Sequence, residues 1–185
     1  MTNKYYTGKG DAGDTGFFGT ADRFPKSSLR VEALGTVDEL GSWVGLCKAK
    51  VQSEKVKVIL EAVQQHLFTI QAEIGGADVH LKAEHIKNIE EEISRISTTL
   101  PKITEFKLSG ASELCAMLDV TRTVARRAER RIVALAKDTQ VMGASQGRPR
   151  EHTLSYLNRI STLFYVLARQ EAVKCGIMEK SPEYK

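Results

Sequence analysis

Residues 53–76 read SEKVKVILEAVQQHLFTIQAEIGG, and this stretch decides the fold class. Its apolar residues recur every three or four positions from Val56 to Ile74, which is the spacing of one face of an α-helix. The run begins directly after Ser53, a residue type that caps helix N-termini, and it stops at a pair of glycines. The stretch therefore predicts an amphipathic helix.

The same spacing recurs along the rest of the chain, with Ser27 or Ser28 placed to cap the first helix. Short connections between helices favour an all-α, five-helix bundle. We expect a single domain over residues 1–185, with an N-terminal loop at about 5–25 and the bundle at about 27–176. The predicted helices run from about residue 27 to 50, 53 to 76, 83 to 97, 111 to 137 and 151 to 175. A long connector is expected at 138–150, where glycine, serine and proline interrupt the helical pattern.

Composition narrows the function classes. The net charge of +4 is mild and does not by itself argue for a nucleic-acid or membrane partner. No apolar leader and no run of eighteen uncharged apolar residues is present, so we expect a soluble, cytoplasmic protein. The cysteines are expected to be reduced packing residues, and the histidines lack metal-ligand spacing, which predicts no structural zinc. The cysteines are Cys47, Cys115 and Cys175, and the histidines are His66, His80, His85 and His152. His66 is expected on a helix flank.

A glycine-rich stretch, TGKGDAGDTGFFG at residues 7–19, precedes the first helix. It differs from a phosphate-binding P-loop because Asp14 replaces the required lysine and because no strand–helix alternation follows. Glycine-rich backbone can still surround an anion with N–H donors, and Thr7 and Thr15 add hydroxyls. Asp11 and Asp14 could hold Mg²⁺ or orient a lysine. An ordinary flexible arm is the alternative that the loop alone leaves open.

A second feature is TRTVARRAERR at residues 121–131. At 100° per residue, Arg122, Arg126 and Arg130 form one stripe together with Glu129. Arginine binds phosphate through a planar fork, so the stripe favours a polyphosphate site in which Glu129 fixes a neighbouring guanidinium. A solvated face with surface ion pairs is the alternative. The apolar face beside the stripe is expected to contain Leu114, Leu118, Thr121, Ala125, Ala128 and Ile132, while Arg127 and Arg131 are expected to point elsewhere, to solvent or a subunit contact.

A triphosphate would explain the loop and the arginine stripe together. Four ordered segments resemble those of the PduO-type ATP:cob(I)alamin adenosyltransferases, and the resemblance extends from about Tyr6 to Gly176. The segments are TGKGDAGDTGFFG, RFPKSSLRVEALGTVDELGSWVGL, CAMLDVTRTVARRAERR and SYLNRISTLFYVLAR. The resemblance implies that cobalt of cob(I)alamin attacks C5′ of ATP and expels triphosphate. It further implies a homotrimer with each active site at a subunit interface, and transfer of the product to a B12-dependent enzyme. Mg²⁺ is the expected metal.

The same resemblance implies roles for individual residues. Arg126 is expected to be catalytic, because its charge would offset the charge growing on the triphosphate. Arg122 is expected to pair with Asp38 across subunits. The implied ATP-binding residues are Thr7, Gly8, Lys9, Gly10, Asp11, Gly13, Asp14, Thr15, Lys26, Arg126, Arg127, Glu129, Arg130 and Asn158.

Phe106 is the implied corrinoid-side residue, at the lower axial face of cobalt. A bulky apolar ring there would exclude water and the cofactor's own base, which makes reduction to Co(I) easier. From the sequence alone, without the resemblance, Phe106 is better interpreted as a core aromatic near a helix start. The chain departs from the family pattern nearby: LSGA at residues 108–111 replaces LPGG, and Asp119 replaces a common histidine. Gly41 also replaces a common asparagine or serine.

Two other function classes remain open at the level of the sequence. A nucleotide-dependent hydrolase or kinase would release ADP and orthophosphate instead of intact triphosphate. A non-enzymatic bundle that binds nucleic acid through its arginines would show steep salt dependence. Low aromatic content and the lack of an RNA-binding signature count against the second class.

Overall fold

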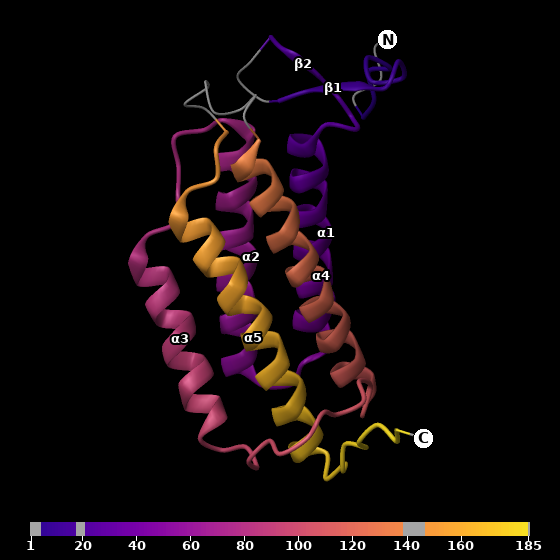
Figure 1. Cartoon of the computed structure of the whole chain (residues 1–185), viewed down its shortest axis with the longest axis vertical. Coiled ribbons are helices and arrows are strands. Elements are labelled where there is room, and N and C mark those ends of the chain that lie inside the picture. Colours follow the sequence, from indigo (N-terminus) through magenta and orange to yellow (C-terminus); the bar gives the residue numbers. More distant parts are fainter. Residues whose placement is uncertain (1–4, 18–20, 139–146, 185) are drawn as a thin grey trace.

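The computed structural model describes residues 5–17, 21–138 and 147–184. Five helices run along the long axis of the molecule, and a short two-stranded sheet lies at the end where α1 begins (Figure 1). This confirms the predicted all-α bundle, whereas the predicted N-terminal loop carries a small hairpin that the sequence analysis did not anticipate. The elements are β1 (Asp14–Gly16), β2 (Arg23–Pro25), α1 (Leu29–Lys50), α2 (Glu54–Gly75), α3 (Ala83–Ser97), α4 (Glu113–Lys137) and α5 (Glu151–Lys174).

The bundle core lies where the apolar faces of the helices meet. α4 packs against both α5 and α1, α1 also packs against α2, and α3 lies along α5 (Figure 1). The predicted faces are confirmed: Val56, Leu60, Leu67 and Ile74 of α2 are all buried. Burial of these faces supplies the main favourable free energy of folding.

Capping residues set the helix boundaries close to those predicted. The hydroxyl of Ser28 accepts a hydrogen bond from the Val31 N–H, so Ser28 is the N-cap of α1. Ser112 caps α4 in the same way, which starts that helix two residues later than predicted. Gly76 ends α2 with a φ of 100°, a conformation that suits glycine.

The start of α5 is fixed by a buried carboxylate. Glu73 of α2, 4% exposed, accepts hydrogen bonds from the backbone N–H of Arg150 at 2.6 Å and from the hydroxyl of Thr153 at 2.9 Å. A negative charge at a helix N-terminus is favourable because the free N–H groups point toward it. Asp138 and Arg150 cap α4 and α5, so both ends of the predicted connector are non-helical, and residues 139–146 lie outside the described part.

The cysteine prediction is right for two residues and wrong for the third. Cys47 and Cys115 are buried, but Cys175 is exposed because it lies at the C-terminal end of α5, beyond the core. Within the described ranges, no helix is long and apolar enough to cross a membrane.

Candidate functional site

The glycine-rich loop is closed by two cationic side chains from β2 and the residue after it. The Lys26 ammonium donates to the Gly10 carbonyl at 2.8 Å, and Arg23 donates to the Lys9 carbonyl at 2.6 Å. Arg23 also binds the carboxylate of Asp14, and this contact lowers the pKa of Asp14. Asp14 therefore pairs with an arginine and not with a lysine, contrary to one of the predicted options.

Two glycines allow the backbone conformation of the loop. Gly8 and Gly13 have φ values of 68° and 89°, which residues with a side chain rarely adopt. Space at Gly10 is tight, because a Cβ there would lie 3.2 Å from the Lys26 ammonium and 3.3 Å from the Asp14 carbonyl oxygen. The loop is therefore a defined, mostly exposed turn, held by main-chain and side-chain hydrogen bonds.

The arginines of α4 divide into two groups. Arg127 binds Glu39 of α1, and Arg131 lies 3.2 Å from Glu32 of the same helix. These two side chains therefore form ion pairs with α1, and both stay partly open to solvent, at 42% and 46% exposed, as one of the predicted options has it. Arg126 and Arg130, both exposed, have no acidic partner among the described residues.

Glu129 and Asn158, both predicted to bind ATP, are in contact in the structure. The Asn158 amide of α5 donates to the Glu129 carboxylate of α4 at 2.9 Å. Arg159 in turn donates to the Asn158 carbonyl oxygen at 2.8 Å. Glu129 and Asn158 thus form a polar link between α4 and α5, and Glu129 lies between Arg126 and Arg130 along α4. One nitrogen of the Arg130 guanidinium donates to the Arg126 carbonyl at 3.1 Å, and its other donors have no acidic partner in the described chain. Two arginines beside a fixed hydrogen-bonding group are suited to binding an anion.

Sequence reasoning missed Arg30, which joins the loop region to the bundle. Its guanidinium carbon lies 4.4 Å from the centre of the Phe17 ring and 5.1 Å from that of Phe24. The Arg30 Nε also donates to the Ile74 carbonyl at 2.7 Å. The sequence does contain a signal for this contact: Arg30 is a basic residue at the start of the first helix, and the aromatic residues Phe17 and Phe24 precede it.

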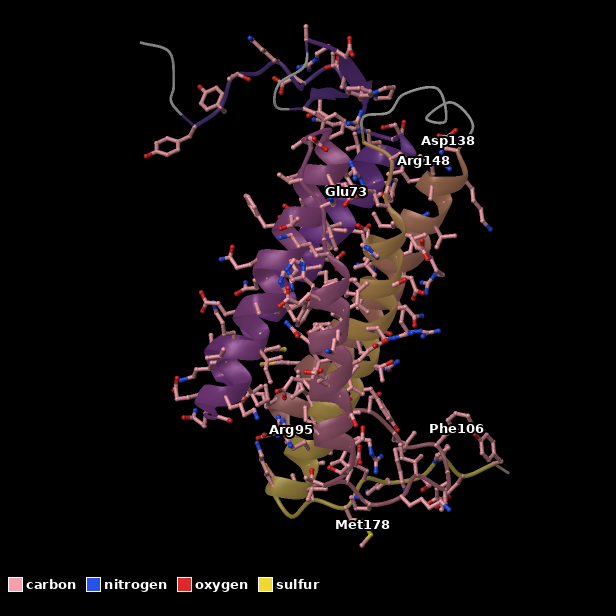
Figure 2. All side chains as sticks on the ribbon, turned by 90° about the vertical axis from the view of Figure 1, so that its left-hand side faces the viewer. Glu73, Arg95, Phe106, Asp138, Arg148 and Met178 are labelled. Carbon is pink, nitrogen blue, oxygen red and sulfur yellow. The ribbon has the colours of Figure 1, made fainter. Side chains whose placement is uncertain are left out.

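Phe106 lies at the opposite end of the molecule, where Figure 2 shows it pointing away from the bundle. Its side chain is 80% exposed, so the reading of Phe106 as a core aromatic is wrong. The segment that carries it lies outside the helices, between α3 and α4. Phe106, Ile103, Tyr165 and Tyr184 line a surface cavity of about 570 Å³.

The loop and Phe106 are separated by the length of the bundle. α4 alone has 25 residues, which corresponds to about 37 Å at 1.5 Å per residue. β1 and β2 lie at one end in Figure 1, and Phe106 lies at the other in Figure 2. A single chain therefore does not bring the two predicted parts of the site onto one small ligand.

The predicted subunit-interface residues each have a neighbour within the chain. Asp38 accepts a hydrogen bond from the Gln71 amide at 3.4 Å and lines a surface cavity of about 510 Å³ between α1 and α2. The Arg122 Nε lies 3.8 Å from the Asp119 carboxylate, which is too far for a hydrogen bond. This Nε is buried and has no hydrogen-bond partner in the part of the chain that the structure describes.

One histidine of α2, His66, lies where three helices meet. His66 is half-buried and contacts two other helices, stacking on His85 with ring centres 4.3 Å apart and hydrogen-bonding the Tyr156 hydroxyl at 2.8 Å. Burial, and then the neighbouring His85, lower the pKa of His66 to about 4. Across the described ranges, no group of three or more histidine, cysteine or acidic residues could hold a metal ion.

The chain resembles known proteins along most of its length. The family model described as Cobalamin adenosyltransferase matches residues 5–171. Corrinoid adenosyltransferase of Bacillus subtilis is 37% identical, with 94% of this chain and 89% of that protein covered. Corrinoid adenosyltransferase PduO of Salmonella typhimurium is 38% identical over 90% of this chain, which spans only about half (49%) of that relative's length.

A solved structure resembles the whole chain. It is a variant of the PduO-type ATP:corrinoid adenosyltransferase from Lactobacillus reuteri, complexed with cobalamin and ATP. Its TM-score is 0.84 at 31% identity, and the alignment covers 98% of this chain and 100% of that one. With the family match spanning nearly the whole sequence, the chain belongs to the cobalamin adenosyltransferase family.

Proposed function

We propose that this protein transfers the 5′-deoxyadenosyl group of ATP to the cobalt of cob(I)alamin, which forms adenosylcobalamin and releases triphosphate. Membership of the family and the names of the relatives support the reaction. The observation that carries the proposal is the exposed pair Arg126 and Arg130. These two guanidinium groups are free of acidic partners within the described chain and lie beside the Glu129–Asn158 link.

The reaction balances without an added oxidant or base. The lone pair on Co(I) forms the new bond to C5′, while the bond between C5′ and the phosphate oxygen breaks and its electrons leave with triphosphate. Negative charge therefore grows on the leaving group. The Arg126 guanidinium would stabilise that charge, and orientation of the two substrates would supply much of the remaining acceleration.

The glycine-rich loop would bind the triphosphate. The described loop residues are mostly exposed, and the loop carries the Lys26 ammonium at its rim. Lys26 would exchange its contact with the Gly10 carbonyl for a stronger, charge-assisted bond to a phosphate oxygen. Mg²⁺ would arrive with ATP, since hard phosphate oxygens are its preferred ligands.

Phe106 would act on the corrinoid side. An exposed apolar ring is available to lie against the lower face of the macrocycle, whereas a core residue would not be. Water and the cofactor's base would both be excluded from that face, and loss of an axial donor favours reduction of Co(II) to Co(I).

The site would be completed by a second copy of the chain. The glycine-rich loop and Phe106 lie at opposite ends of the bundle. One copy of the chain would therefore supply the loop that binds ATP, and a neighbouring copy would supply the Phe106 that contacts the corrinoid. Arg122 supports this arrangement, because its side chain is 27% exposed and its nearest carboxylate, that of Asp119, is 3.8 Å away. Asp38 of a neighbouring copy would pair with the exposed part of this side chain, and a closed ring of three copies would contain three equivalent sites.

The reaction is tested by mixing anaerobically reduced cob(I)alamin with ATP and Mg²⁺ and following the absorbance change. The phosphate product is identified in parallel. Adenosylcobalamin together with intact triphosphate is the expected result, and Arg126→Ala should abolish it while Arg131→Ala preserves it. Release of ADP and orthophosphate without corrinoid conversion would replace the proposal with a hydrolase or kinase.

A further inference from the structure

The turn in front of α4 is held at two points that the sequence did not indicate. The Leu108 N–H donates to the Lys180 carbonyl of the C-terminal segment at 2.8 Å. Two residues later, the Gly110 N–H donates to a carboxylate oxygen of Asp119 at 3.0 Å. Phe106 lies four residues before Gly110, so these two bonds fix the backbone that leads to its ring.

Gly110 has a φ of 92°, a left-handed conformation at the centre of this turn. The turn is not part of a helix or strand, so its N–H has no regular backbone partner. Asp119 lies on the second turn of α4, where a short carboxylate can reach back to the residues before the helix. Its acceptor oxygen thus replaces the missing backbone partner.

The second carboxylate oxygen of Asp119 faces Arg122. The Asp119 oxygen and the Arg122 Nε are 3.8 Å apart, and the two side chains are only 16% and 27% exposed. At this distance the contact is electrostatic, and partial burial limits screening by solvent. One carboxylate therefore lies between the Phe106 turn and the arginine that the proposed function places at the subunit interface.

We propose that Asp119 is a positioning residue for the corrinoid side of the site. It orients the turn that presents Phe106, and it links that turn to Arg122 through its second oxygen. The role rests on the proposed function, because Phe106 must contact the corrinoid for its position to matter. Asp119 itself touches neither substrate.

Three variants separate the hydrogen bond from the charge. Asp119→Ala removes both, whereas Asp119→Asn keeps an acceptor oxygen for Gly110 and removes the charge that faces Arg122. Glu92→Ala is the matched control, because Glu92 forms the same kind of (i,i+3) carboxylate–arginine pair with Arg95 on α3. Figure 2 shows Arg95 well apart from Phe106.

Backbone hydrogen exchange and steady-state kinetics are measured on each variant as the full-length protein. Asp119→Ala should speed exchange in residues 107–112 and raise KM for cob(I)alamin about fivefold to tenfold, the size expected for one lost hydrogen bond. KM for ATP should stay unchanged. Asp119→Asn should keep the wild-type exchange rate and a near wild-type KM for cob(I)alamin.

A double-mutant cycle with Phe106→Ala shows whether Asp119 acts through the ring. If it does, Asp119→Ala adds little to the KM for cob(I)alamin once Phe106 is gone. Equal effects in both backgrounds, or a fall in thermal stability with no change in KM for cob(I)alamin, would overturn the positioning role. An inactive wild-type protein would instead contradict the proposed function, and the exchange measurement would still report whether Asp119 holds the turn.

Discussion

The Arg30 guanidinium carbon lies 4.4 Å from the centre of the Phe17 ring, so α1 holds the N-terminal arm by a cation–π contact. The rings of Phe17, directly after β1, and Phe24 of β2 lie 4.9 Å apart, so both aromatics lie against one cation. Because Arg30 also donates to the Ile74 carbonyl, the arm, α1 and the end of α2 meet at this side chain. The glycine-rich loop is therefore attached to the bundle through Arg30.

Replacing Arg30 should loosen the loop more than the bundle. Arg30→Met keeps an apolar stem but removes the charge over the two rings, and a partly desolvated cation–π contact contributes about 1 to 2 kcal/mol. We expect KM for ATP to rise about threefold to tenfold, with KM for cob(I)alamin unchanged. Arg30→Lys should give an intermediate value, because it keeps the charge and loses the planar group. Equal changes in both KM values would contradict this role.

Lys26→Met should weaken ATP binding and open the loop. The ammonium both closes the loop through Gly10 and, under the proposed function, binds a phosphate. Loss of a charge-assisted hydrogen bond should raise the Kd for ATP, measured by calorimetry, about tenfold. Lys87→Met, at an exposed lysine of α3, is the control and should bind ATP normally. A Kd unchanged in both variants would remove Lys26 from the site.

Arg126→Ala should reduce turnover and leave stability intact. Removing one preorganised positive charge that faces a developing anion typically lowers kcat about a hundredfold or more. The side chain is exposed and has no acidic partner in the described ranges, so the thermal unfolding midpoint should not move. Arg131→Ala should show the opposite pattern, with normal kcat and at most a small stability loss from its exposed ion pair with Glu32.

His66 should make the folded protein less stable in mild acid. Its pKa is lowered from 6.5 to about 4 by burial and by His85, so the unfolded chain binds a proton at a higher pH than the folded one. The stability associated with neutral His66 is therefore complete above about pH 6.5 and is lost as the pH falls toward 4. Urea unfolding across this range measures the slope.

His66→Gln is the matched variant for that measurement. Its amide can still hydrogen-bond the buried Tyr156 hydroxyl but does not titrate. We expect a shallower loss of the free energy of unfolding between about pH 6.5 and 4.5 than in the wild type. Parallel slopes in the two proteins would assign the acid sensitivity to other groups.

The helices and their buried faces could be predicted because those signals are local. Hydrophobic spacing and capping serines depend on residues a few positions apart, so they are readable without any tertiary information. The same applies to the arginine stripe, since residues four positions apart lie on one side of a helix. The surroundings of single side chains could not be predicted in the same way: the sequence did not indicate the acidic partners of Arg127 and Arg131 on α1 or the exposure of Phe106.

The sequence by itself determined an all-α chain, the faces that form its core, and the residue types available to bind a triphosphate. Only the tertiary structure decided which charges are free: α1 neutralises Arg127 and Arg131 and leaves Arg126 and Arg130 available. It also brought Arg30 under Phe17 and Asp119 to Gly110. The physical reason is that helix formation follows from short-range periodicity, whereas these contacts depend on packing between segments and on long-range closure of the chain.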